Sequence, residues 1–373
     1  MAAVVLAAAT GLAALTASRR SGALSFVDGS PSATPASSAR PGASGADLAT
    51  APGGLPSPTA GSAAGRTPSP SGAATSGQSP APAQPTAATL VPRSGAYLGV
   101  YVQPPAYTPT SEIAAVQRFQ RLMHHSVQLI HVYHPWLSPF PDQADRYFVN
   151  HGKVLLLTWG GTPDTRAIIA GRYDEMIRAR AQALKRLGKP VLLEFRHEMD
   201  RPNLQWAVHG PRDYIAAWDH IRSIFRQVGA SNVGWVWCPT GYGFQIGRAQ
   251  AFYPGANEVD WVCADVYSFA STQSLAQAAQ PFLTWAAHTH KPVLIGEFAV
   301  NGAPSSWASW LTAAGRLAER DHQIKGMAYF DANGRDSQGR PFRYWLPTSP
   351  AAVSAFANML AWRYFRPAIP VGL

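Results

Sequence analysis

The chain is poor in the residues that mark disulfide-rich, metal-binding and nucleic-acid-binding proteins. Its 373 residues include only two cysteines, Cys238 and Cys263, and no CxxC or Cys/His spacing typical of a metal site. Both lie in apolar runs, so a disulfide and two buried free thiols are equally open. Charged residues make up 14% of the chain, and its net charge of +10 is spread without a block of Lys and Arg. We therefore expect no nucleic-acid partner, because such proteins usually concentrate basic residues in a patch.

Aromatic residues are absent from positions 31–90, where Ala, Gly, Pro, Ser and Thr fill 52 of the 60 positions. Such a segment cannot bury a core and is typical of a disordered linker. All 12 Trp and all 13 Tyr follow residue 94. We therefore divide the chain into residues 1–20, a disordered linker over 21–93, and a globular domain over 94–373 that is long enough to bury one large core.

The first 17 residues are almost all small and apolar, and Arg19 and Arg20 follow them. This pattern resembles an export signal or a membrane anchor, although a membrane-spanning helix needs ~20 residues. We expect the protein to be secreted or anchored at the cell surface, with this segment as a membrane or cell-wall tether. A cytoplasmic protein with a disordered tail is the alternative.

Short apolar runs alternate with amphipathic helical patterns through the globular domain. The eight strand candidates are 96–103, 127–133, 153–159, 190–196, 233–238, 259–267, 291–298 and 325–330. The clearest helical patterns are 111–124, 174–187, 211–228, 274–288, 305–320 and 350–364. Near-continuously apolar strands are typical of buried parallel sheets, so the alternation predicts an α/β fold, a (β/α)8 TIM barrel. A doubly wound open sheet is the alternative, but no GxGxxG turn follows the first strand, and the Gly-rich segment 241–247 is expected to be a loop.

Polar and aromatic side chains gather at the predicted carboxyl ends of the strands, where a (β/α)8 barrel places its active site. They are His131, Tyr133, His134, Trp136, Trp159, Arg196, His197, Glu198, Asp200, Trp235, Trp237, Asp265, Tyr267, Glu297, Tyr329 and Asp331. Aromatic faces stack on sugar rings, and two carboxylates at one barrel mouth are the minimum machinery for glycoside hydrolysis. The GxSxG and HExxH motifs of serine hydrolases and zinc proteases are absent. The sequence therefore predicts a glycoside hydrolase that needs no metal or organic cofactor.

Two motifs carry a family resemblance. FRHEMD (195–200) and LIGEFA (294–299) resemble the two catalytic signatures of glycoside hydrolase family 26, whose barrels carry carboxylates on strands four and seven. The resemblance covers essentially the whole of 95–365. It implies a β-mannanase-like endo-β-glycanase whose partner is a polysaccharide, with β-1,4-mannan the first choice and mixed-linkage β-glucan or β-xylan next. A monomer is expected.

The resemblance also implies roles for individual residues. Glu198 would be the general acid/base and Glu297 the nucleophile of a retaining, double-displacement reaction. His197 would contact the substrate near its 2-hydroxyl, and Tyr267 would donate a hydrogen bond to Glu297 and lower its pKa. The further substrate-binding candidates are His134, Trp159, Asp265, Trp237, Arg196, Asp200 and Tyr329. Arg196 is expected to pair with a carboxylate inside the barrel.

Two positions depart from the family's mannanases. Asp200 and Arg201 follow HEM where those enzymes usually carry Asn-Gly, and Tyr329 and Phe330 stand where a Trp is common. Both differences fall near the expected substrate, so they weaken the mannan assignment and leave the reaction class unchanged. A non-catalytic carbohydrate-binding barrel is the alternative function.

Overall fold

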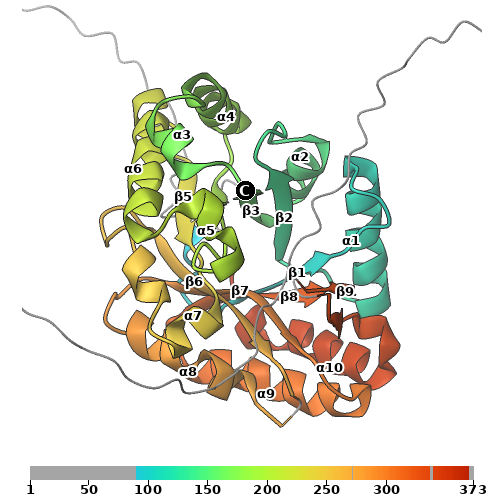
Figure 1. Ribbon diagram of the computed structural model, residues 1–373. Helices are drawn as coiled ribbons and strands as arrows, with labels where there is room; N and C mark the ends of the chain where they lie inside the picture. The colour runs from blue at the N-terminus through green and yellow to red at the C-terminus, as the bar shows by residue number, and fades with distance from the viewer. Residues whose placement is uncertain (1–89, 271, 337–338, 369–373) are drawn as a thin grey trace, which may run out of the picture. The chain divides into compact units, whose positions relative to one another are not determined.

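The computed structural model describes residues 90–270, 272–336 and 339–368. The predicted N-terminal segment, and the predicted linker up to residue 89, lie outside these described residues. Eight parallel strands close into a barrel in the order β1 to β8, and helices surround it (Figure 1). The predicted (β/α)8 barrel is confirmed over the open-sheet alternative.

The strands match the eight predicted apolar runs. They are β1 (Tyr97–Val102), β2 (Leu129–Pro135), β3 (Val154–Gly160), β4 (Val191–Phe195), β5 (Val233–Trp237), β6 (Trp261–Ser268), β7 (Val293–Val300) and β8 (Ile324–Asp331). Almost every residue in them is buried, as expected for strands that contact the barrel interior on one face and helices on the other.

Six helices correspond to the predicted patterns. They are α1 (Pro109–Met123), α4 (Asp174–Leu187), α6 (Pro211–Val228), α8 (Leu275–Ala286), α9 (Trp307–Arg320) and α10 (Pro350–Ala361). The sequence signals for their ends are used: α6 begins at Pro211, and α4 and α6 both end at glycines with positive φ, Gly188 and Gly229.

Several short elements were not predicted. They are α2 (Gln143–Asn150), α3 (Thr165–Ile169), α5 (Gln205–Val208), α7 (Gly241–Gln245), and the antiparallel pair β9 (Asn333–Arg335) and β10 (Pro341–Arg343). The prediction of a loop over 241–247 is wrong, because α7 begins there. Thr240 caps this helix by accepting a hydrogen bond from the Gly243 amide at 2.8 Å. The glycines there serve close packing. A Cβ at Gly243 would lie 1.8 Å from Asp200 Oδ2.

The core has two parts. One fills the barrel interior with side chains such as Tyr97, Leu129, Leu156 and Trp261, and the other lies between the strands and the helices. Leu90, the first described residue, is fully buried against the interior cluster. No helix of the described ranges is long and apolar enough to cross a membrane.

Cys238 and Cys263 form a disulfide that links the end of β5 to β6 inside the barrel. Their Cα atoms lie 4.3 Å apart, and both side chains are fully buried. The sequence left a disulfide and two free thiols open, and the structure has the disulfide.

Candidate active site

A β-bulge in β7 determines where Glu297 points. Ala264 of β6 pairs with Ile295, whereas the next residue, Asp265, pairs with Glu297, so Gly296 is the extra residue. Leu294 faces the barrel interior and Ile295 faces the helices. Strict alternation would therefore turn Glu297 outward. The bulge restores its inward direction, and bulges next to active sites commonly re-aim a side chain in this way.

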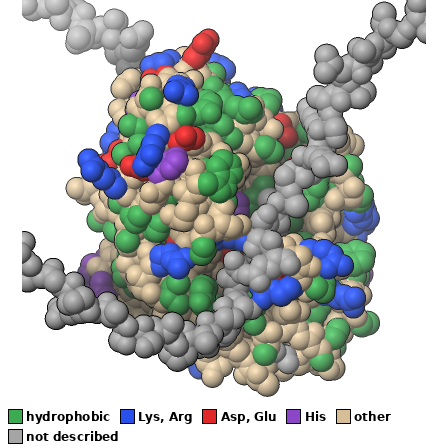
Figure 2. Space-filling view, in the orientation of Figure 1, with side chains coloured by type: hydrophobic (Ala, Val, Ile, Leu, Met, Phe, Trp, Pro, Cys, Tyr) green, Lys and Arg blue, Asp and Glu red, His purple; other side chains and the backbone are tan. Residues whose placement is uncertain are grey.

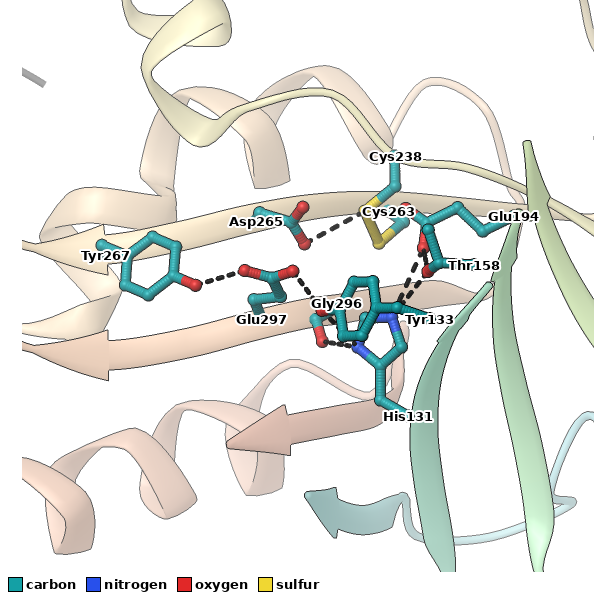
Figure 3. A network of polar contacts seen from close by, with 10 residues as sticks. All are labelled: His131, Tyr133, Thr158, Glu194, Cys238, Cys263, Asp265, Tyr267, Gly296 and Glu297. Carbon is teal, nitrogen blue, oxygen red and sulfur yellow. Dashed lines mark hydrogen bonds and ion pairs between the residues drawn. A yellow bond between two sulfur atoms is a disulfide. The ribbon is translucent and has the colours of Figure 1, made fainter. Parts of the chain in front are cut away.

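Glu297 is fully buried and held by two phenols from different strands. Tyr267 of β6 donates to its Oε2, which is the hydrogen bond that the resemblance implies, and Tyr133 of β2 donates to its Oε1 (Figure 3). The sequence places Tyr133 among the residues at the predicted strand ends, but neither the strand pattern nor the family resemblance gives it a role. Its signal in the sequence is its spacing of two from His131, which places both side chains on the inward face of one strand.

The pKa of Glu297 is raised, although Tyr267 was expected to lower it. Burial and the neighbouring Glu198 raise the pKa of Glu297 to about 8, while the hydrogen bonds from Tyr133 and Tyr267 lower it. The lowering contribution expected from Tyr267 is therefore present, but burial outweighs it. Buried carboxyl groups at such a site are expected to have raised pKa values, because desolvation disfavours the charged form.

Asp265 lies next to Glu297 and also faces the barrel interior. Its Oδ1 is 3.4 Å from Sγ of Cys238, and a disulfide sulfur has no proton to donate. The contact is a hydrogen bond only if the Asp265 carboxyl is protonated and donates. Burial and the charge of Glu297 raise the pKa of Asp265 well above its usual range, which agrees with this assignment. A neutral Asp265 adds no second negative charge beside Glu297, whose ionised form the two phenols stabilise.

Next to Glu297, a chain of polar contacts runs through His131, Thr158 and Glu194 (Figure 3). Thr158 donates its hydroxyl proton to Glu194, so it accepts from His131 Nε2 at 2.7 Å. His131 Nδ1 is 3.2 Å from the carbonyl oxygen of Gly296, which can only accept. His131 Nε2 also lies 3.6 Å from Glu194 Oε2. Thr158 and His131 thus give polar partners to a carboxyl group that would otherwise be buried alone.

Glu198 lies in the loop that follows β4. Arg196 and Glu198 both have left-handed backbone conformations, with φ of 51° and 52°, and such strain in non-glycine residues clusters at functional sites. The Glu198 amide donates to the Cys238 carbonyl at 2.8 Å, which ties the loop to the end of β5. Arg201 donates to Glu198 Oε2 at 2.7 Å, and both side chains are buried. Arg201 is the residue that replaces the mannanase glycine.

His197 lies between these strained residues, at the same mouth. Its ring contacts Tyr133 edge-on with a centroid distance of 5.6 Å, and a Cβ at Gly160 would lie 3.7 Å from it. Burial lowers the pKa of His197. The structure thus brings together five of the predicted residues: His197, Glu198, Asp265, Tyr267 and Glu297.

Two of the predicted substrate-binding residues, Arg196 and Asp200, hold loops of the protein in place. Arg196 was expected to pair with a carboxylate, but it donates to the Pro163 carbonyl at 2.8 Å, and no described carboxylate pairs with it. Asp200 accepts hydrogen bonds from the amide and hydroxyl of Thr240, at 2.9 and 2.6 Å. It therefore braces the β4 loop against the start of α7.

The remaining four predicted residues point away from the barrel interior, into the layer between strands and helices. Trp159 stacks on Trp136 at 4.2 Å, and Trp237 packs on Trp285 of α8 at 5.2 Å. His134 lies 2.9 Å from Asp145 of α2. The fourth, Tyr329, donates to the Tyr344 carbonyl and packs against α10. Their positions on the strands place all four opposite the inward-facing set, because successive side chains alternate.

Two groups of described residues have metal-binding donor atoms within 4.8 Å of one another. The first is Glu194 with Cys238 and Cys263, whose sulfurs are joined to each other and are not thiolate ligands. The second is His134, Asp142 and Asp145. Its atoms already serve the capping box of α2 and the contact between His134 and Asp145.

Comparison with known proteins finds relatives that match the part of the chain that carries this site. Residues 160–300 match the sequence profile of glycosyl hydrolase family 26. Endoglucanase H of Acetivibrio thermocellus is 32% identical over 291 residues, covering 72% of this chain and 30% of that protein. A beta-1,3-xylanase of an Alcaligenes species is 25% identical over 214 residues, covering 48% and 43%. The chain thus spans less than half the length of these two relatives.

Solved structures share the fold. A beta-mannanase from a symbiotic protist of the termite Reticulitermes speratus matches with a TM-score of 0.55 and 14% identity, over 76% of this chain and 92% of that one. A Cellulomonas fimi endo-beta-1,4-mannanase matches with a TM-score of 0.55 and 16% identity, over 76% of each chain. At these identities the likeness shows the barrel alone. The profile match contains both Glu198 and Glu297, and this part of the chain is a glycoside hydrolase family 26 domain.

Proposed function

We propose that this protein is a retaining glycoside hydrolase that cleaves a β-linked polysaccharide. The observation that carries the proposal is the placement of Glu297, which a bulge turns into the barrel mouth between two phenol donors and within electrostatic reach of Glu198. A purely structural carboxylate would not need a bulge and two donors from separate strands.

The reaction follows from these positions. Glu297 attacks the anomeric carbon, the bond to the leaving oxygen breaks, and Glu198 gives that oxygen its proton. Glu198 then takes a proton from water, whose oxygen displaces Glu297 from the anomeric carbon. Retention of configuration requires a separation of ~5–5.5 Å between the two carboxyl groups. The ion pair with Arg201 has to loosen in the first half of this cycle, because Glu198 must then carry a proton.

For the substrate, we place a β-glucan ahead of β-1,4-mannan. The relative with 32% identity is named an endoglucanase, and the mannanase structures are too dissimilar in sequence to bear on specificity. Arg201 beside Glu198 also distinguishes this site from the mannanase pattern. A β-xylan is the third choice, since a second relative is named a beta-1,3-xylanase.

We also propose that the enzyme acts outside the cytoplasm, released or tethered through its N-terminal segment. The Cys238–Cys263 disulfide supports this location, because disulfides persist in oxidising compartments. Cell fractionation checks it: recovery of the protein in the cytoplasmic fraction with free thiols would contradict the proposal.

The mechanism is tested with the full chain on barley β-glucan, galactomannan and xylan. Replacement of Glu297 by Gln is expected to lower kcat by at least ~10³-fold on the polymer that is cleaved, because covalent catalysis is lost. Glu198→Gln should do the same on the polymer. It should cost far less on an aryl glycoside, whose leaving group needs no protonation.

Proton NMR of the first product reports the stereochemistry. The β-anomer should appear first and then mutarotate. Initial formation of the α-anomer would show inversion and overturn the nucleophile assignment. No sugar release from any polymer by a folded protein, together with glycan binding, would favour the non-catalytic barrel.

A further inference from the structure

A groove of about 790 Å³ opens beside the catalytic mouth, between α1 and the segment that follows β8. The residues that matter in its lining are Gln103, Arg118, Arg121, Asp331, Asn333 and Trp345. None of them belongs to the catalytic group described above. We propose that this groove binds a carboxylate-bearing stretch of the glycan chain, so that the enzyme acts on an acidic β-glycan. This inference rests on the proposed hydrolase function and adds a substrate class to it.

Two neighbouring strands connect the groove to the active site. Tyr101 of β1 pairs in register with Phe330 of β8, and their rings stack at 4.8 Å. Tyr101 also contacts Tyr133, the donor to Glu297, at 4.9 Å. The next registered pair, Val102 and Asp331, already lines the groove. One registered pair of residues therefore separates Tyr133, which contacts Glu297, from the lining of the groove.

The charge of the groove favours an anion. Arg118 and Arg121 lie three residues apart on α1, so both side chains face the same side, and both are exposed. Within the described ranges, neither guanidinium has a carboxylate partner. The one acidic residue in the lining is Asp331, which is 1% exposed and accepts a hydrogen bond from the Leu346 amide at 2.7 Å. Burial raises the pKa of Asp331 to about 7, which weakens its opposition to an anion.

In Figure 2, several Lys and Arg side chains lie over the region of α1 and β9, and others lie elsewhere on the same face. Guanidinium groups match carboxylates with paired, parallel hydrogen bonds, which makes arginine the fitting residue for an acidic sugar.

The groove also has a fixed aromatic surface. Trp345 is 47% exposed, and no described ring contacts its indole. Its backbone is held nonetheless: Asn333 Oδ1 accepts the amides of Tyr344 and Trp345, at 3.1 and 3.2 Å. The Asn333 amide in turn donates to Gln103 Oε1 at 3.1 Å. An exposed, anchored aromatic beside two arginines suits a sugar ring with an anionic substituent, because the ring stacks while the substituent pairs.

The test is isothermal titration calorimetry of the full chain in 0.15 M NaCl. The background variant Glu297→Gln keeps the probes intact. The probes are carboxymethylcellulose and hydroxyethylcellulose, which share a backbone and differ in charge. The charged polymer is expected to bind several-fold more tightly. Replacing Arg118 and Arg121 together with Gln should weaken its binding about fivefold, since two exposed ion pairs with the polymer's carboxylates are lost. Binding of the neutral polymer should not change.

Trp345→Ala should weaken the binding of both probes. The matched control is the pair Arg178→Gln and Arg186→Gln, two exposed arginines on α4 that line a different basic depression. The control should bind both probes as the parent does. Equal loss in the control, equal affinity of the parent for the two polymers, or no effect of Trp345→Ala would each overturn the proposal.

The outcomes separate this proposal from the proposed function. Sugar release that depends on both glutamates, with unchanged binding in the groove variants, would leave the hydrolase standing and remove the acidic specificity. Selective loss of binding in the groove variants, with no hydrolysis of any glycan, would keep the groove and remove the hydrolase.

Discussion

At the scale of single residues, Glu297 depends on the two phenols that contact it. Each donates to a different carboxylate oxygen, and each lowers a pKa that burial raises. Tyr267 precedes Glu297 by 30 residues, and Tyr133 precedes it by 164. The two donors therefore act on one group only because the barrel closes.

Replacing Tyr133 by Phe removes one donor and keeps the ring. Because the lost hydrogen bond favours the anion, the pKa of Glu297 should rise, and the acidic limb of the kcat/KM profile should move to higher pH. A hydrogen bond to a charged group is worth ~1.5–3 kcal/mol, so kcat/KM should fall roughly 10–100-fold at the optimum. The pH dependence of kcat/KM measures both effects.

Tyr214→Phe is the matched control. Tyr214 donates to the Phe195 carbonyl at 3.2 Å and lies in the layer between barrel and helices. Its loss should lower the free energy of unfolding without moving the acidic limb. A Tyr133→Phe profile that coincides with that of the parent would contradict the role assigned to Tyr133.

At the scale of elements, the bulge in β7 is the feature on which the site depends. The extra residue of the bulge is Gly296, which has no side chain, and there is no room for one. A Cβ there would lie 2.6 Å from Cys263 Sγ and 2.7 Å from Asp265 Oδ1. The disulfide between β5 and β6 thus packs directly against the backbone that orients Glu297.

Gly296→Ala should therefore damage activity more than stability. Overpacking of this kind costs ~1–3 kcal/mol, which a domain of this size can tolerate, while even a small displacement of Glu297 should lower kcat by about 100-fold. Urea unfolding and kcat on the cleaved polymer give the two numbers. Gly160→Ala is the control, because its Cβ would come no closer than 3.7 Å to another atom. Similar losses of kcat in both variants would show that the bulge has no special role.

At the scale of the whole molecule, buried carboxyl groups set how stability depends on pH. Burial raises the pKa of Glu297 to about 8, of Asp331 to about 7 and of Asp200 to about 6. Each folded-state pKa lies above the ordinary value near 4, so the folded state keeps protons that the unfolded state releases. Stability then falls as pH rises from about 4 through these values. His197, whose pKa burial lowers, acts in the opposite direction.

We expect the free energy of unfolding in urea to be higher at pH 5 than at pH 8. Asp331→Asn should reduce this difference by on the order of 1–3 kcal/mol, because the amide cannot ionise and its oxygen can still accept the Leu346 hydrogen bond. Glu175→Gln, at an exposed position on α4, should leave the difference unchanged. Greater stability at pH 8 in the parent, or an unaltered difference in Asp331→Asn, would refute the account.

The sequence by itself determined the architecture of this protein. Apolar runs at regular spacing predicted all eight strands, and proline, glycine and basic residues marked helix ends, because these signals act over a few residues. The motifs around Glu198 and Glu297 identified the family for the same reason, since each is a short continuous segment.

Only the tertiary structure decided which strand-end residues meet. Four predicted residues lie at the right level on their strands, but strict alternation turns their side chains toward the helices. They are Trp159, Trp237, His134 and Tyr329. An inserted residue reverses that alternation in β7, and no local pattern in the sequence predicted this bulge. Tyr133, Asp265 and the disulfide converge on Glu297 from strands distant in the chain, because closing the barrel brings inward-facing side chains to one axis.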